Sequence, residues 1–138
     1  MENNKLQAPN DKQYQSTKRE NLKPYDLEER TLEYARRVNL YVRSLPKNVS
    51  NYENGKQLIR AAGSVGANYI EANEALSKKD FAMRVKIARK EAKESRFWLE
   101  LTIPDTNTSN EKRLLINEAI ELTKILSSIL LKCKSFNV

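Results

Sequence analysis

The stretch DLEERTLEYARRVNLYVRSL, residues 26–45, carries the pattern that decides the fold. Apolar or compact side chains recur in it at alternating spacings of four and three positions, which places them all on one face of an α-helix. This seam consists of Leu27, Thr31, Tyr34, Val38, Tyr41 and Leu45. Asp26 is a suitable N-cap, and Pro46 stops the helix. The stretch therefore predicts a long amphipathic helix that packs against other helices.

Two later stretches repeat the same spacing. One follows a variant capping box at residues 77–80, runs up to Pro104, and contains Phe81, Val85, Ala88, Ala92, Ser95 and Leu99. The other follows a fuller capping box, Thr108-Ser109-Asn110-Glu111, and contains Leu115, Ala119, Leu122, Leu126, Ile129 and Cys133. Between the first and second seams, a further helix is predicted from Ser50 or Asn51 to Ala75. The fold class is therefore all-α, an antiparallel up-down four-helix bundle.

Glycine is rare in the chain, yet two of its three glycines, Gly63 and Gly66, lie in the middle of the helix predicted near residues 51–75. Glycine inside a helix costs up to about 1 kcal/mol relative to alanine. Their presence among Ala and Ser predicts that another backbone packs closely here. The close neighbour is either a second helix of the same chain or a second subunit.

Composition separates a tail from the bundle. Residues 1–24 are polar and predict a disordered tail, and residues 25–135 form the single predicted domain. The chain has one cysteine and no histidine, which favours a reducing, cytoplasmic location and removes the commonest catalytic base. No secretory signal or membrane-spanning apolar run is apparent.

No catalytic motif is recognisable, so we expect no enzymatic activity and no cofactor. The carboxylate pairs Glu71/Glu74 and Glu91/Glu94 are each spaced for one helical face, but they lack the histidines of di-metal bundles. We interpret them as solvated or ion-paired carboxylates, and we expect no metal site. Cys133 lies on a seam and is interpreted as a small buried hydrophobic residue.

Basic residues concentrate on one predicted helix. Of the formal net charge of +7, residues 77–103 carry +4, from eight basic and four acidic side chains. Heptad-spaced cations form a stripe beside the seam, consisting of Lys79, Lys86, Arg89, Lys93 and Arg96. Such a stripe is typical of proteins that bind the phosphate backbone of nucleic acids. The alternative is a charged face that only keeps the protein soluble.

A family resemblance lies in the same two helices. The stretch QLIRAAGSVGANYIEA, residues 57–72, and the segments Lys79-Asp80-Phe81, Ile87-Ala88-Arg89 and Ala92-Lys93-Glu94 resemble proteins encoded in bacterial 23S rRNA intervening sequences. The accessory variability protein of diversity-generating retroelements is a relative of that family. Departures from the family pattern include Ile59 in place of an arginine and Ala72 in place of a glycine.

The resemblance implies a four-helix bundle that assembles into a homopentamer and has no catalytic activity. For the retroelement relatives it also implies binding to a reverse transcriptase and to RNA or DNA. The motif positions Arg60, Gly63, Ser64, Gly66, Asn68 and Glu71 are interpreted as subunit-contact or structural groups. Two hypotheses remain open: a nucleic-acid-binding or ribonucleoprotein accessory protein that uses the basic stripe, and a protein-interaction scaffold that binds no nucleic acid.

Overall fold

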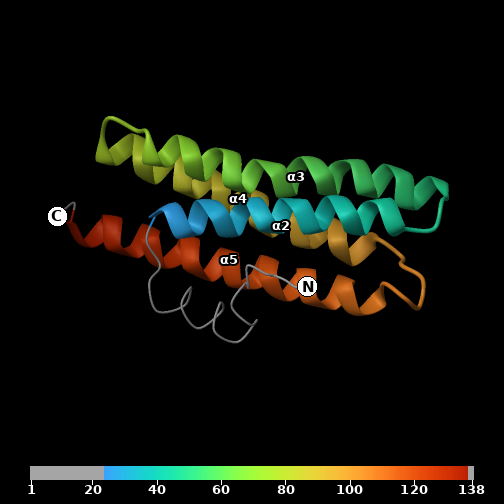
Figure 1. The fold of residues 1–138 in the computed structure, drawn as a ribbon. Helices are drawn as coiled ribbons and strands as arrows, with labels where there is room; N and C mark the ends of the chain where they lie inside the picture. The colour runs from blue at the N-terminus through green and yellow to red at the C-terminus, as the bar shows by residue number, and fades with distance from the viewer. Residues whose placement is uncertain (1–23, 137–138) are drawn as a thin grey trace, which may run out of the picture.

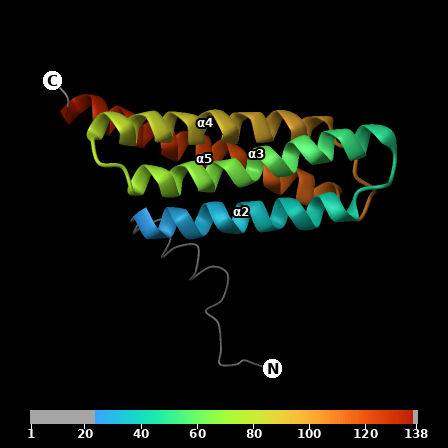
Figure 2. The same ribbon diagram turned by 90° about the horizontal axis from the view of Figure 1, so that it is seen from above.

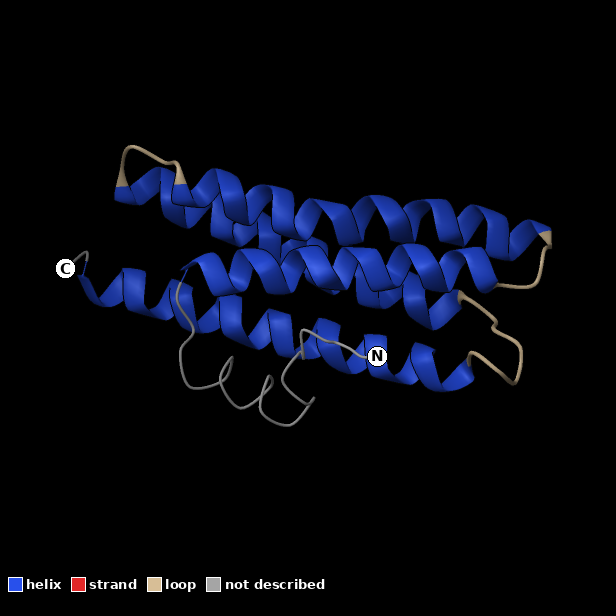
Figure 3. Ribbon diagram, viewed as in Figure 1, coloured by secondary structure: helices blue, strands red, loops and turns tan. Residues whose placement is uncertain are grey.

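The computed structural model describes residues 24–136, which form four helices joined by short loops (Figures 1 and 3). They are α2 (Pro24–Ser44), α3 (Val49–Asn73), α4 (Lys78–Leu101) and α5 (Ser109–Phe136). The all-α prediction is therefore confirmed. The predicted disordered tail lies outside the described residues, apart from Pro24, which is already helical.

The helices run alternately up and down, and each lies against the helix that follows it in the chain (Figures 1 and 2). The contact between α5 and α2 closes the bundle, although it is less extensive than the other three contacts. The predicted antiparallel up-down bundle is therefore confirmed. None of the helices described between residues 24 and 136 is long and apolar enough to cross a membrane.

The predicted seams of α2 and α4 face the core, and the seam of α5 is buried from Leu115 to Leu126. The seam of α2 is buried along its whole length, from Leu27 to Leu45. The seam of α4 is buried from Val85 to Leu99, with Phe81 partly exposed at its beginning. In α5 the buried position after Leu126 is Leu130 rather than Ile129, because a helix of 3.6 residues per turn drifts relative to a strict heptad.

The predicted helix starts are correct for α4 and need correction elsewhere. The Ser77 side chain caps α4 by accepting a hydrogen bond from the amide of Asp80 at 3.1 Å, as expected. Helix α2 begins at Pro24 rather than after Asp26, since proline fits a first helical position that needs no N–H partner. Helix α3 is capped by Asn48, two or three residues earlier than predicted.

The expected capping box of α5 is not formed. The Thr108 hydroxyl donates to Asp105 at 3.0 Å, and the Glu111 carboxylate accepts hydrogen bonds from the Arg37 guanidinium of α2. Arg30 and Glu118 form a second bidentate pair between α2 and α5, with N–O distances of 2.7 and 2.9 Å. These two partly buried bidentate pairs hold α2 against α5, where the contact between the helices is less extensive than elsewhere in the bundle.

Two tyrosines cross the core from α2 to α4. The hydroxyl of Tyr34 lies 2.7 Å from the Ser95 hydroxyl, and one heptad later the hydroxyl of Tyr41 lies 2.8 Å from the Thr102 hydroxyl. Ser95 and Thr102 in turn donate to backbone carbonyls three residues earlier in the chain. The polar atoms of both buried tyrosines are thus satisfied inside the core.

These tyrosines should make the protein sensitive to alkali. Burial raises the pKa of Tyr34 from 10.0 to about 12, and burial also raises the pKa of Tyr41. The unfolded chain therefore loses its phenolic protons first, so stability is complete below about pH 10 and falls as the pH rises toward about 12. Urea unfolding at pH 8 and near pH 11.5 should show a loss of about 2 kcal/mol from Tyr34. A Tyr34→Phe variant should have a shallower loss, and an equally steep one would contradict this account.

The glycines of α3 differ in their surroundings. A Cβ atom at Gly66 would lie 2.8 Å from Oγ1 and 3.2 Å from Cβ of Thr31, a fully buried residue of α2. A Cβ atom at Gly55 would lie 2.9 Å from Cγ1 of Val42, also in α2. Gly63, in contrast, is exposed and has open space where a Cβ would be. The predicted close approach is therefore intramolecular at Gly66, and nothing in the chain requires glycine at position 63.

Replacement by alanine should have opposite effects on stability at Gly66 and at Gly63. Gly66→Ala should lower the free energy of unfolding by about 1–2 kcal/mol, since Thr31 is β-branched, buried and hydrogen-bonded to Glu28. Gly63→Ala should raise it by about 0.5–1 kcal/mol through helix propensity. Urea denaturation of the two variants measures the difference, and Thr31→Ala should partly restore Gly66→Ala. Equal effects at both positions would contradict the assigned packing.

Candidate nucleic-acid interface

Two of the four acidic residues of α4, Glu91 and Glu94, are paired with a cation of α3. Facing α3, the Arg60 guanidinium lies 3.0 Å from the Glu94 carboxylate and 3.7 Å from that of Glu91. Glu91 is largely buried in this position. Because these two acidic residues of α4 are paired toward α3, they do not offset the cations on the side that faces α5.

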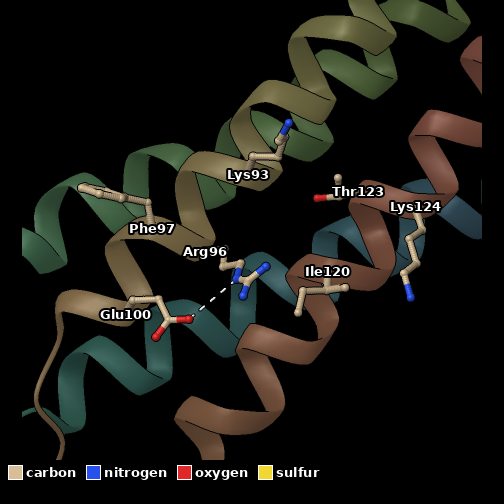
Figure 4. Close-up of a pocket in the computed structure, with 7 residues that line it drawn as sticks. All are labelled: Lys93, Arg96, Phe97, Glu100, Ile120, Thr123 and Lys124. Atoms are coloured by element: carbon tan, nitrogen blue, oxygen red, sulfur yellow. Dashed lines mark ion pairs between the residues drawn. The ribbon is translucent and has the colours of Figure 1, made fainter.

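A groove lies between α4 and α5, and we call it the basic groove (Figure 4). Its volume is about 460 Å³. Three cations line it, Lys93 and Arg96 from α4 and Lys124 from α5. The remaining lining residues are Phe97, Glu100, Ile120 and Thr123.

Both charged and apolar groups are accessible in the basic groove. Figure 4 shows Arg96 facing Ile120 across it, with Lys93 and Lys124 on opposite sides and Phe97 projecting from the outer edge of α4. Arg96 is about half exposed and lies 3.7 Å from Glu100, a distance typical of a weak surface ion pair. Lys124 is 70% exposed and lies 3.8 Å from Glu121. These cations remain available to an anionic ligand.

The predicted basic stripe is only partly gathered in this groove. Lys93 and Arg96 line it, whereas Lys79 and Lys86 are exposed farther toward the beginning of α4. Arg89 is partly buried and donates to the Ser127 hydroxyl of α5 at 3.3 Å, so its guanidinium already has a partner within the bundle. Arg89 is therefore the least accessible member of the stripe.

Sequence reasoning missed the half of the site that α5 contributes. Ile120, Thr123 and Lys124 lie far from the stripe in sequence, and only the pairing of α4 with α5 brings them beside it. The exposed aromatic ring of Phe97, next to two predicted cations, was the available signal. A single aromatic residue on a helix is common, so this signal is weak.

A second, smaller hollow lies nearer the beginning of α4 and the end of α5. It has a volume of about 250 Å³ and is lined by Lys78, Phe81, Ile129, Lys132 and Cys133. Cys133 is therefore partly exposed rather than fully buried, which corrects the expectation from its place in the seam. The drift of α5 that buries Leu130 also turns Cys133 toward this hollow.

The motif residues of α3 make contacts within the chain. Besides Arg60, Asn68 joins α3 to α4, since its side-chain oxygen accepts a hydrogen bond from Arg84 at 3.2 Å. The side-chain nitrogen of Asn68 donates to the backbone carbonyl of Ser64 at 2.9 Å. Glu71, in contrast, is exposed. The structure thus places Arg60 and Asn68 at the α3–α4 contact, Gly66 at the α2–α3 contact, and Gly63 on the outside.

Comparisons with known proteins agree with this fold. The family model for 23S rRNA-intervening sequence protein matches residues 23–128. A crystal structure of a protein of unknown function from the S23 ribosomal protein family of Bacteroides thetaiotaomicron is 38% identical, with a TM-score of 0.63. That match covers 75% of this chain and 96% of the other. A search among curated proteins found no match. With most of the bundle inside the matched region, the chain belongs to the 23S rRNA-intervening sequence protein family.

Proposed function

We propose that this protein binds RNA or DNA through the basic groove and acts as a non-enzymatic accessory protein in the cytoplasm. The observation that carries the proposal is that three cations line one groove, while two acidic residues of α4 are paired on the opposite side of that helix. On the side facing α3, Arg60 forms ion pairs with Glu91 and Glu94. On the side facing α5, Lys93 and Arg96 line one groove together with Lys124 of α5. Cations gathered on one face are the electrostatic footprint of phosphate-backbone binding.

The basic groove offers no set of groups arranged to read base edges. Its cations are flexible side chains on the outside of two helices, and two of its other four lining residues, Phe97 and Ile120, are apolar. Binding through such a surface releases counterions from the nucleic acid and depends weakly on sequence. A reverse transcriptase, the protein partner that the family resemblance suggests, would join such a complex as an additional component.

Salt dependence tests this proposal directly. Fluorescence anisotropy with labelled oligonucleotides of unrelated sequence should show binding at about 50 mM salt that weakens strongly at about 200 mM. The slope of log affinity against log salt should be near −0.7 to −0.9 for each phosphate contact. The absence of binding at the lower salt concentration, with the protein folded, would favour the protein-interaction scaffold instead.

A specific observation also supports self-assembly. The outer face of α3 presents exposed apolar or small residues at helical spacing, namely Ile59, Gly63, Ala67 and Ile70. We propose that a second copy of the chain packs on this face within a homo-oligomer, and a homopentamer is the form that the resemblance implies. Sedimentation equilibrium should detect an oligomer, and Gly63→Leu should shift it toward monomer while the helix content stays unchanged. A wild-type monomer at tens of micromolar would contradict self-assembly.

A further inference from the structure

The basic groove combines two features that a double helix would not use together. Cations at its rim suit phosphates, but its lining also includes the apolar side chains of Phe97 and Ile120. Phe97 is 57% exposed, so much of its apolar side chain is open to a ligand. A duplex presents its phosphates outward and keeps its bases stacked inside, so it would leave these apolar surfaces uncovered. An unpaired strand can cover both.

The size of the groove also favours an unpaired strand over a duplex. A volume of about 460 Å³ lies within the range of sites that enclose a small ligand. A hollow of this size accommodates a nucleotide or so of an unpaired strand, whereas a base-paired helix can only lie across its mouth. Charge and apolar surface therefore act on the same nucleotide only when its base is free.

Phe97 is held in a suitable position for stacking. Its ring and that of Trp98 pack in a T-shaped arrangement, with the ring centres 5.0 Å apart and the planes at 82°. Trp98 is itself partly buried against the core, so it supports one side of Phe97 while the rest of the ring stays open to solvent. Sequence-independent binding of single strands commonly combines such an aromatic platform with a positively charged groove.

Resting on the proposed function, we infer that the basic groove is a subsite for single-stranded nucleic acid. One base stacks on Phe97 while Lys93, Arg96 and Lys124 hold the neighbouring phosphates. Arg96 and Lys124 each lie beside a carboxylate, Glu100 at 3.7 Å and Glu121 at 3.8 Å, so each exchanges a weak surface ion pair for its phosphate contact. The nucleic acid class is thus an unpaired strand, either RNA or DNA.

The test compares one labelled strand in two forms. Anisotropy is measured with an oligothymidylate of about 16 nucleotides, alone and paired with its oligodeoxyadenylate complement. Wild-type protein should bind the single strand several-fold more tightly than the duplex. Phe97→Ala should weaken single-strand binding about fivefold or more and leave duplex binding nearly unchanged. Phe97→Tyr should retain the preference because it keeps the ring.

Met83→Ala provides a matched control. Met83 is another large apolar side chain exposed on α4, at 54%, and it does not line the basic groove. This variant should bind like the wild type, and its circular dichroism should match that of Phe97→Ala. Equal affinity for both forms, or no effect of Phe97→Ala, would overturn the single-strand inference. The proposed function would survive if binding remained salt-dependent, and it would fail together with the inference if neither form bound.

Discussion

Replacing Asn51 with alanine should lower the free energy of unfolding by about 3–4 kcal/mol, a large effect for one polar side chain. Asn51 is 3% exposed at the beginning of α3. Its side-chain nitrogen, Nδ2, donates to the carbonyl oxygens of Pro46 at 2.9 Å and Ile103 at 3.0 Å. Its side-chain oxygen accepts a hydrogen bond from the Ile103 amide at 2.9 Å.

The size of the effect follows from what these bonds connect. Pro46 lies in the connection between α2 and α3, and Ile103 in the connection between α4 and α5, at the same end of the bundle (Figure 1). Alanine removes three hydrogen bonds at once and leaves backbone groups without partners, each costing about 1 kcal/mol or more. Asn51→Asp should also destabilise, because a carboxylate cannot donate to either carbonyl.

Asn39→Ala is the matched control for this prediction. The Asn39 side chain donates only to the Ala35 carbonyl of its own helix and is exposed, so its loss should change stability by less than about 0.5 kcal/mol. Urea denaturation followed by circular dichroism measures both variants. If Asn51→Ala were as stable as Asn39→Ala, the two loops would not be held together as the structure indicates.

The sequence predicted which residues are buried better than it predicted their partners. The apolar spacing of α2 was sufficient to identify its whole buried face, because burial in a helix depends mainly on periodicity. It could not show that Tyr34 reaches Ser95 across the core, or that Gly66 makes room for Thr31. Such contacts depend on the relative register of two helices, which periodicity within one helix does not fix.

Polar residues near helix ends were the main source of error. Asn51 resembled a helix start, but Asn48 caps α3 and leaves Asn51 to join two loops. Glu111 completed a capping-box pattern in the sequence, but its carboxylate instead forms a bidentate ion pair with Arg37 of α2, which is a stronger interaction. In both cases a tertiary contact competes with the local motif for the same side chain, and the local motif is not formed.

The candidate site was predictable on one helix only. The basic stripe identified Lys93 and Arg96, which depend on the sequence of α4 alone. Lys124 joins them because α5 runs antiparallel beside α4, and the pairing of Arg60 with Glu94 shows which α4 charges are already compensated. Which residues make up the site therefore depends on how the helices pack together, and not only on the spacing of cations along α4.

Removing the three cations of the basic groove should produce the largest effect on nucleic-acid binding. The variant Lys93→Gln/Arg96→Gln/Lys124→Gln should bind oligonucleotides roughly 100-fold more weakly at low salt, because three exposed ion pairs at about 0.9 kcal/mol each sum to about 2.7 kcal/mol. The slope of log affinity against log salt should become shallower by about two to three, one contact per removed cation. The weakening should be the same for unrelated sequences, since phosphate contacts carry no sequence information.

The control removes the same net charge from other faces of the bundle. Arg36, Arg43 and Lys56 are exposed on α2 and α3, and their replacement by glutamine lowers the net charge by three without touching the basic groove. If only overall charge attracts the nucleic acid, both triple variants should weaken binding equally, and the proposed site would be wrong. If the groove is the site, the control should keep most of the affinity and nearly the full salt slope, because surface charges more than about 10 Å from a phosphate are largely screened at 0.1 M salt.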